Sequence, residues 1–260
     1  MSSQWENFLG NLGAWSGTFA ELNGHGEVVS TTHSLLTLAQ GEEERLVHFR
    51  LQRYSNAARD GEPCSDIQEA YRNLGKQVVF FPTGTFCKGR LQVSPGTPFA
   101  AEFGFIAGDR RHRLVQLHHE DGRFEKLILI REQRVGSEAA EQAPLTAGSL
   151  SGCWQGTAST ITADWPEPDQ AECHFTVGSS SNRLEISDVG LGANHPEREL
   201  QLTWMADGGY HLTPTIVSHR QAFSIEAGWL SAPNRVERLI RRYDASGAWL
   251  SATQIVAERV

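Results

Sequence analysis

An internal repeat constrains the fold of this chain more than any other feature of its sequence. Residues 107–124, AGDRRHRLVQLHHEDGRF, align without a gap with residues 232–249, APNRVERLIRRYDASGAW, at an offset of 125 positions. The starts of the two halves also correspond, since LGAWSGTF at residues 12–19 resembles SGCWQGTA at residues 151–158. Similarity at both ends of two consecutive segments predicts one domain that occurs twice.

The length agrees with this duplication. A chain of 260 residues fits two domains, each large enough to form its own core. We expect a first domain at residues 1–138, a linker at residues 139–149 and a second domain at residues 150–260. The linker region is acidic and rich in small residues, so it has almost nothing to bury.

Composition and charge narrow the class of protein. Hydrophobic residues make up 39% of the chain, and no apolar run approaches the roughly 18 residues that cross a bilayer. The net charge of -8 argues against a general binder of nucleic-acid phosphates. The start, MSSQWENFLGNLG, has no secretion signal, and the four cysteines form no Cys-x-x-Cys pair. We expect a cytoplasmic protein with buried, reduced thiols and no cofactor.

The periodicity predicts an all-β protein with a short N-terminal helix. Apolar residues at helical spacing within residues 3–12 indicate the helix. The segments that follow are short, rich in Val, Leu, Phe and Thr, and separated by turn sequences such as NGHGE and HEDGR. Residues 56–70 are expected to form a long loop. About eight antiparallel strands per half predict two tandem β-barrels, each of a size that can hold one small ligand.

The opening of each half resembles a known superfamily. Gly13-x-Trp15 and Gly152-x-Trp154 precede halves that each end in an arginine-bearing strand. This resembles the calycins, the lipocalins and fatty-acid-binding proteins, where Gly-x-Trp opens the barrel and a late arginine covers the indole. WENFLGNLGAWSGTF, FPTGTFCKGRLQV and RLIRRYDASGAWLSATQIVAERV are similar to an uncharacterised cyanobacterial family of two-domain lipocalin-like proteins. The resemblance covers nearly the whole chain and implies two lipocalin-like barrels.

A more distant resemblance suggests a ligand. The segment GWLSAPNRVERLIRR is similar to part of the S-type phycobiliprotein lyases, single calycin barrels that hold a linear tetrapyrrole (bilin) and pass it to a cysteine of an antenna protein. The resemblance points to Trp229, Pro233, Asn234, Arg235 and Arg238. This chain departs from those lyases in having two barrels and no counterpart of their histidine-pair region.

The repeated arginines admit two interpretations. Because side chains alternate along a strand, Arg238 shares a face with Val236 and Ile240, and its counterpart in the first half is Arg113. An arginine among apolar neighbours needs partners for its fixed set of donors. The structural interpretation is that these two arginines stack on Trp15 and Trp154 or pair with Glu102 and Glu226. The functional one is that either binds a ligand carboxylate.

Other residues are candidates because they are not all repeated. Five further arginines are expected at exposed positions and could reach a ligand: Arg110, Arg111, Arg235, Arg241 and Arg242. Aromatic walls suited to a flat ligand could come from Trp204, Trp229 and Trp249. The PTGTFCKG segment of the first half also occurs once. His112 and His118 could share a face, but no acidic third ligand is evident, so we expect no metal site.

Three functions remain open. The first is a binding protein for a hydrophobic, partly anionic small molecule such as a bilin or an isoprenoid pigment. Its expected ligand-binding residues are Trp204, Trp229, Asn234, Arg235, Arg238, Arg241 and Arg113. The second is an enzyme, a chromophore lyase, isomerase or cyclase, with Glu226 as acid, although the common hydrolase and phosphate-binding motifs are missing from the sequence. The third is a non-catalytic module that recruits an antenna or other protein partner.

Overall fold

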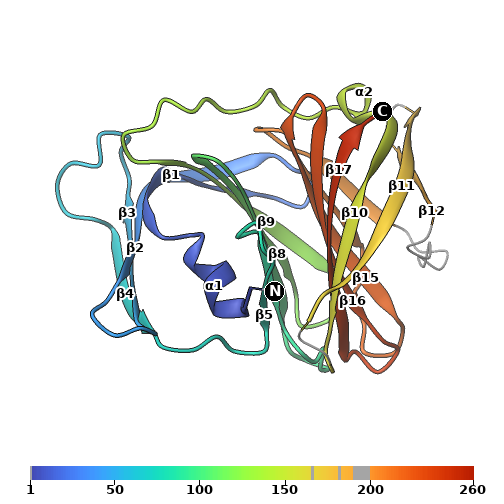
Figure 1. Ribbon diagram of the computed structural model, residues 1–260, viewed down its shortest axis with the longest axis horizontal. Helices are drawn as coiled ribbons and strands as arrows, with labels where there is room; N and C mark the ends of the chain where they lie inside the picture. Colours follow the sequence, from blue (N-terminus) through green and yellow to red (C-terminus); the bar gives the residue numbers. More distant parts are fainter. Residues whose placement is uncertain (1, 165–166, 181–182, 190–199) are drawn as a thin grey trace. The chain divides into compact units, whose positions relative to one another are not determined.

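The computed structural model describes residues 2–164, 167–180, 183–189 and 200–260, which are almost entirely β-structure (Figure 1). In this part of the chain, one antiparallel sheet has the strand order β4-β3-β2-β1-β9-β8-β7-β6-β5, and a second has the order β12-β11-β10-β17-β16-β15-β14-β13. The first half of the chain contains α1 (Gln4–Leu9), β1 (Gly13–Leu22), β2 (Val28–Gln40), β3 (Val47–Tyr54), β4 (Ser65–Tyr71), β5 (Val78–Phe80), β6 (Phe86–Gly89), β7 (Phe99–Ala107), β8 (Arg110–His118) and β9 (Phe124–Arg134). The second half contains α2 (Ala147–Leu150), β10 (Gly152–Thr162), β11 (Asp169–Ser180), β12 (Arg183–Val189), β13 (Leu200–Trp204), β14 (Gly209–Pro214), β15 (Phe223–Ala232), β16 (Arg235–Tyr243) and β17 (Trp249–Arg259).

Each half curls because its first strand pairs with both its second and its last. β1 is hydrogen-bonded to β2 and to β9, and β10 is hydrogen-bonded in the same way to β11 and β17. This pairing joins the first strand of each meander to its last, and the curved sheets end at β4 and β5 in the first half and at β12 and β13 in the second. The expected all-β fold of two tandem lipocalin-like barrels, produced by duplication and preceded by a short helix, is confirmed.

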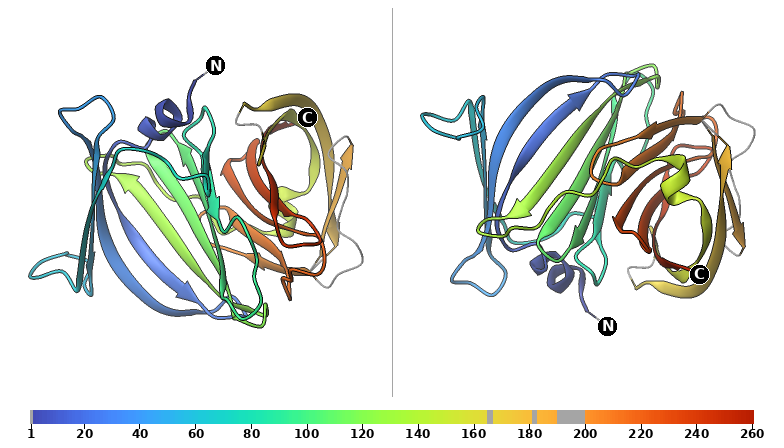
Figure 2. Two further views of the ribbon diagram at one scale, coloured as in Figure 1. Left: turned by 90° about the horizontal axis from the view of Figure 1, so that it is seen from below. Right: turned by 90° about the horizontal axis from the view of Figure 1, so that it is seen from above.

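The N-terminal helix caps one end of the first barrel (Figure 2). Ser3 is the N-cap of this helix and forms a reciprocal capping box with Glu6. Its Trp5 and Phe8 are buried in the same core cluster as Trp15. The helical spacing of apolar residues therefore marks the face that enters the barrel.

The Gly-x-Trp motif has the same geometry in both copies. The indole Nε1 of Trp15 donates to the carbonyl of Asn11 at 2.9 Å, and that of Trp154 donates to Leu150 at 3.0 Å. The guanidinium carbons of Arg134 and Arg259 each lie 4.3 Å from the centroid of the corresponding indole. The late arginine that covers the indole is therefore present in each barrel.

The glycines of this motif make room for those arginines. Gly13 and Gly152 have φ values of +123° and +133°, and a Cβ at either position would overlap the Nη1 atom of Arg134 or Arg259. That atom instead donates to a main-chain carbonyl, Leu12 in the first copy and Ser151 in the second. Glycine is required here both for its backbone conformation and for the close approach.

Two expectations need correction. Residues 65–70 of the expected long loop belong, together with Tyr71, to β4, which pairs with β3. Most of its residues are exposed, as befits a strand at the end of the sheet order, so it lacks the alternation that marks a half-buried strand. Of the four cysteines, Cys87 and Cys173 are buried, but Cys64 and Cys153 are exposed. Cys153 precedes the inward Trp154, so its side chain points outward.

The chain packs as two compact units. The first consists of Met1–Lys88, Glu102–Gln116 and Lys126–Ala140, and the second consists of Gly89–Ala101, Leu117–Glu125 and Glu141–Val260. Short segments of the first repeat thus belong to the second unit. The domain boundaries expected near residues 138 and 150 stay a prediction. None of the helices in the described part of the chain has the length and apolar character needed to span a membrane.

Candidate functional site

Arg113 lies on the inner face of the first barrel within a charged network. Its Nε is 3.1 Å from Glu132 and its Nη1 is 3.0 Å from Glu102. Arg111 lies 3.3 Å from the same Glu132 carboxylate, which is fully buried. Burial lowers the pKa of Arg111 to about 10, while the two carboxylates hold the pKa of Arg113 above its ordinary value. Both groups therefore carry positive charge inside this barrel at neutral pH.

Arg238 occupies the equivalent position in the second barrel. It donates to Glu226 at 2.8 and 3.2 Å, and the hydroxyl of Tyr210 also donates to Glu226. Burial, followed by the Glu226 charge, raises the pKa of Tyr210 well above its ordinary value, so this hydroxyl stays protonated. All three side chains are buried, which gives Glu226 the environment of an internal ion-pair partner.

The sequence predicted one of the two structural roles of these arginines. Pairing of Arg113 with Glu102 and of Arg238 with Glu226 is confirmed. Stacking of these arginines on Trp15 and Trp154 was wrong. Arg113 lies over Phe19, at 5.7 Å, and Arg238 over Phe175, at 4.8 Å. The indoles are instead covered by Arg134 and Arg259, which are the last residues of β9 and β17.

The expected exposure of the other arginines was wrong in three cases. Arg241 has no exposed surface, donates to the Tyr243 hydroxyl at 3.2 Å and lies over Trp249. Arg110 and Arg111 are also buried. Alternation predicts only one buried face per strand, but both faces of β8 and β16 are buried, so the sequence pattern could not separate inside from outside.

The structure does not bring all predicted ligand residues together. Trp229 pairs with Glu237 across β15 and β16, so it lies on the face opposite Arg238, and its Nε1 donates to Asp207 at 2.7 Å. Trp204 is partly buried and packs edge-on against Tyr210. The turn residues Pro233 and Asn234 are exposed, Arg242 is partly buried, and Arg235 is partly exposed 3.6 Å from Glu237.

The inner face of the first barrel is open to solvent along β3 and β4. Trp15 pairs with Leu36, Leu36 with Leu51, and Leu51 with Ile67, so these four side chains point to the same side. Leu36 is 1% exposed, yet Leu51 is only partly buried and Ile67 is 44% exposed. The apolar inner surface therefore changes from core at Trp15 to accessible surface at Ile67.

Arg53 lies beside this accessible surface and was missed in the sequence. It follows Leu51 by two residues on β3, so it shares the inner face. Its guanidinium lies 5.0 Å from the centroid of Phe19 and donates to the hydroxyl of Thr32 at 2.7 and 3.0 Å. The alternation in VHFRLQRY, which puts Phe49, Leu51 and Arg53 on one face, is the signal that could have identified it.

The inner face of the second barrel is packed in its described part. Trp154, Phe175 and Tyr210 are all at most 3% exposed, and they form one core cluster with Val236 and Ile240. The inward Arg238 and Glu226 are also inaccessible. Within the described residues, the inner face that has an accessible apolar surface near an arginine is therefore that of the first barrel.

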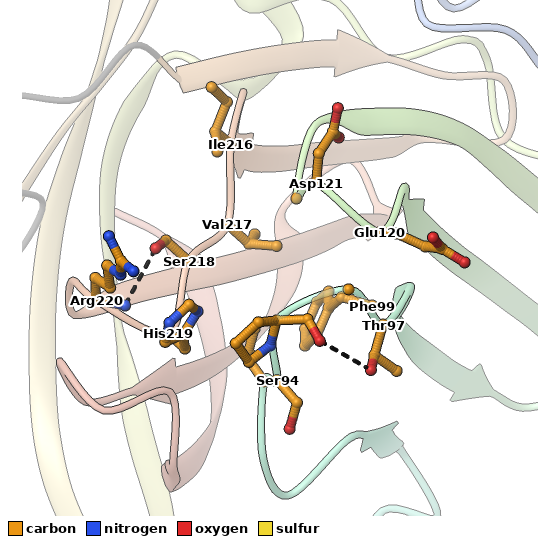
Figure 3. A pocket seen from close by; sticks show the side chains of 14 residues that line it. Ser94, Thr97, Phe99, Glu120, Asp121, Ile216, Val217, Ser218, His219 and Arg220 are labelled. Carbon is orange, nitrogen blue, oxygen red and sulfur yellow. Dashed lines mark hydrogen bonds between the residues drawn. The ribbon is translucent and has the colours of Figure 1, made fainter.

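A separate pocket of about 330 Å³ lies in the second compact unit (Figure 3). Its lining includes the buried residues Val93, Phe99 and Val217. His219 and Arg220 lie on one side, and Glu120 points away from the other labelled side chains (Figure 3). None of the predicted ligand residues lines this pocket. No group of three or more His, Cys, Asp or Glu residues in the described part of the chain could hold a metal.

The fold and the residues described above define a protein of two tandem β-barrels, the first of which has an inner face that is partly accessible along β3 and β4. The chain belongs to the family described as domain of unknown function DUF3598, whose N-terminal domain matches residues 1–137. A family member of unknown function from Nostoc punctiforme, a cyanobacterium, is similar over 100% of both chains, with 32% identity and a TM-score of 0.87. The expected cyanobacterial family is thereby supported.

Other comparisons are weaker or cover one half. Residues 141–192 and 185–260 match the C-terminal domain of the family named biogenesis factor required for ATP synthase 1. An S-type phycobiliprotein lyase from Guillardia theta is 10% identical over 100% of this chain and 93% of its own, with a TM-score of 0.20, too low to support a functional argument. A search of curated proteins found no significant match.

Proposed function

We propose that this protein binds a hydrophobic, partly anionic small molecule on the inner face of its first barrel. The observation that carries the proposal is the accessible inner surface at Leu51 and Ile67, beside the guanidinium of Arg53. Ligand sites are mostly apolar with a few polar groups that fix orientation, and this surface has that composition. Bilins and isoprenoid pigments, which combine a conjugated body with carboxylates or other polar ends, are the ligand classes proposed, within a calycin-type barrel in the cytoplasm.

The proposal is tested by blocking the inner surface with charge. Ile67→Glu places a carboxylate on the inner face, where it would repel an anionic ligand and disrupt the apolar surface. We expect at least about a tenfold loss of affinity, because burying an unpaired charge against a ligand costs well over 1.4 kcal/mol. The measurement is quenching of tryptophan fluorescence by retinoic acid, an isoprenoid carboxylate, and by biliverdin, a bilin.

The matched control is Gln68→Glu, which adds the same charge at the next residue. Gln68 pairs with Arg50, so it points to the outer face of β4 and is exposed. This variant should bind both probes with unchanged affinity. Lack of binding by the unaltered protein, or equal affinity of the Ile67→Glu variant, would contradict the proposal.

An enzymatic use of a barrel is the alternative for the second copy. It would assign acid chemistry to Glu226, which here is buried between Arg238 and Tyr210. Glu226→Gln should then abolish turnover of a bound chromophore while leaving its affinity largely intact. Because the described side chains around Glu226 are inaccessible, we favour the binding function of the first barrel over this one.

A second candidate function comes from the match of the C-terminal half. The name of the matching family, biogenesis factor required for ATP synthase 1, suggests assembly work with a protein partner. Deleting the gene should then lower the amount of assembled ATP synthase, measured on native gels against the amount of its separate subunits. Unchanged assembly in the deletion strain would remove this candidate without affecting the ligand-binding proposal.

A further inference from the structure

We propose that Arg53, and not the repeated Arg113, binds the carboxylate of a ligand that has a single carboxylate and a flat apolar body. This assignment rests on the proposed binding function of the first barrel. It names the chemical class that the site selects and the residue that selects it.

Arg113 is a poor anchor because each of its three guanidinium nitrogens already donates to a carboxylate. Its Nε and Nη2 face Glu132 at 3.1 and 3.4 Å, and its Nη1 donates to Glu102 at 3.0 Å. A ligand carboxylate would have to displace the partly buried Glu102 or the fully buried Glu132, and a buried carboxylate left without its cation is strongly destabilising. The repeat therefore preserved an arginine that holds the barrel together.

Arg53 has no such partner. Its guanidinium donates only to the neutral hydroxyl of Thr32, and no carboxylate in the described residues lies within ion-pair distance of it. It is partly exposed on the same face as Leu51 and Ile67. A planar guanidinium with donors to spare can bind a carboxylate through two parallel hydrogen bonds.

The charges around Phe19 favour a monoanion. Phe19 lies within 6 Å of the guanidinium carbons of both Arg53 and Arg113. Arg111 and Arg113 are paired with Glu102 and Glu132, so of these three arginines only Arg53 has no ion-pair partner in the described residues and can neutralise the single charge of a ligand.

Another inward carboxylate is too distant to fill this role. Glu69 pairs with Phe49 and accepts the hydroxyl of Tyr71 at 2.6 Å. It lies four residues along β4 from Ser65, the residue opposite Arg53, or about 13 Å at the usual rise of a strand. The positive end of the inner surface at Arg53 and its negative end at Glu69 are therefore separate.

The shape of the surface indicates the ligand body. The ring of Phe19 and the aliphatic side chains of Leu51 and Ile67 are all at least partly accessible, and they share the inner face with Arg53. Aromatic rings and branched aliphatic chains pack well against flat conjugated or isoprenoid bodies. A carboxylate on Arg53 would leave such a body lying along β3 and β4.

The test compares two probes that differ only in the head group. Retinoic acid and retinol have the same isoprenoid body, but one ends in a carboxylate and the other in a hydroxyl. The full-length protein should bind retinoic acid about tenfold more tightly, since a charge-assisted hydrogen bond adds at least that much. Arg53→Gln should reduce this preference to less than about twofold, mainly by weakening the binding of retinoic acid.

Two further variants complete the test. Arg50→Gln removes an arginine from the same strand that faces outward and pairs with Asp66 at 2.6 Å, so the preference should persist. Arg53→Lys keeps the charge without the planar fork and should retain part of the preference. The retinol affinity of each variant also reports whether its barrel is folded.

The outcomes separate this assignment from the function on which it rests. Binding of neither probe to the unaltered protein would overturn both. Equal affinity for the two probes would overturn the carboxylate assignment and leave the binding function standing. A preference for retinoic acid that survives in Arg53→Gln would show that another group reads the head group.

Discussion

At the scale of single residues, arginine has two distinct structural roles inside each barrel. Arg134 and Arg259 lie over indoles and donate to main-chain carbonyls, which a planar and weakly hydrated guanidinium does well. Arg113 and Arg238 instead neutralise buried carboxylates. The second role is the more demanding, because each partner of a buried pair depends on the other for its charge.

The buried pair in the second barrel gives a stability prediction. Glu226→Gln leaves the guanidinium of Arg238 buried without its carboxylate and removes the charge that accepts the Tyr210 hydroxyl. Removing one partner of a buried ion pair costs about 3–5 kcal/mol, so we expect a loss of this size in the free energy of unfolding. Urea denaturation followed by fluorescence measures it.

Glu258→Gln is the matched control, because it makes the same chemical change at an exposed position of β17. It should alter the free energy of unfolding by less than about 0.5 kcal/mol. If the free energy of unfolding of the Glu226→Gln protein lies within about 1 kcal/mol of that of the unaltered protein, the Arg238–Glu226 pair does not stabilise the second barrel as expected.

At the scale of secondary-structure elements, the repeat made most of the fold predictable. Trp15 and Trp154 lie near the start of strands that the repeat already aligns, and the alternating apolar residues of β1 and β10 place both indoles inward. β4 was not predictable in this way. Its residues are exposed on both faces, so neither alternation nor an apolar run marks it, and only pairing with β3 defines it.

The candidate site was less predictable than the fold. The repeat pointed to Arg113 and Arg238 as candidates, but both form ion pairs with glutamates of the same barrel. It gave no signal for Arg53, which lies in a strand without a repeated arginine. The exposure of Ile67 could not be read from the sequence, because it depends on how far the inner face of β3 and β4 is covered by the rest of the barrel.

A turn in the second compact unit gives a prediction about backbone packing. The carbonyl of Gly122 accepts a hydrogen bond from the amide of Val217 at 2.9 Å, φ at Gly122 is +84°, and a Cβ there would overlap the carbonyl oxygen of Val217. Gly122→Ala should lower the free energy of unfolding by about 3 kcal/mol or more, because it adds a clash with the main chain to the cost of a left-handed alanine.

Gly96→Ala separates these two costs. Gly96 also has a positive φ, of +63°, but nothing lies within 4 Å of the position that its Cβ would take. Its substitution should cost only the conformational strain of about 1–2 kcal/mol. Thermal or urea unfolding of both variants would show the difference, and equal losses would mean that the turn at Gly122 can move away from Val217.

At the scale of the whole molecule, duplication preserved the barrel and let the two interiors diverge. Positions occupied by Arg111 and Glu132 in the first copy correspond to Val236 and Ala257 in the second, at the offset of 125 positions. The first inner face is therefore charged and partly accessible, whereas the described part of the second is largely apolar and packed. Such divergence allows one copy to bind a ligand while the other contributes mainly stability.

Buried histidines of the second compact unit give a prediction for the stability of the whole chain. His118 and His211 are buried, and each contacts the ring of Phe124, at centroid distances of 5.4 and 5.2 Å. Burial lowers their pKa values from 6.5 to about 4 and about 3, because the charged imidazolium loses its hydration; the mutual repulsion of the two rings adds to the effect at His211.

The sign of the pH dependence follows from these lowered pKa values. Below pH 6.5 the unfolded chain binds protons at these histidines and the folded chain does not, so the free energy of unfolding falls as pH falls towards 4. Each histidine contributes at most about 1.4 kcal/mol per pH unit in that range. Urea denaturation at pH 7.0, 6.0 and 5.0 measures the slope.

Neither ring nitrogen of His211 has a hydrogen-bond partner in the described residues, so His211→Phe should preserve the stacking on Phe124 and remove that residue's share of the slope. The exposed His25→Gln should leave the slope unchanged. An acid slope that is the same in the His211→Phe protein would show that other groups, and not the buried imidazoles, make the fold sensitive to acid.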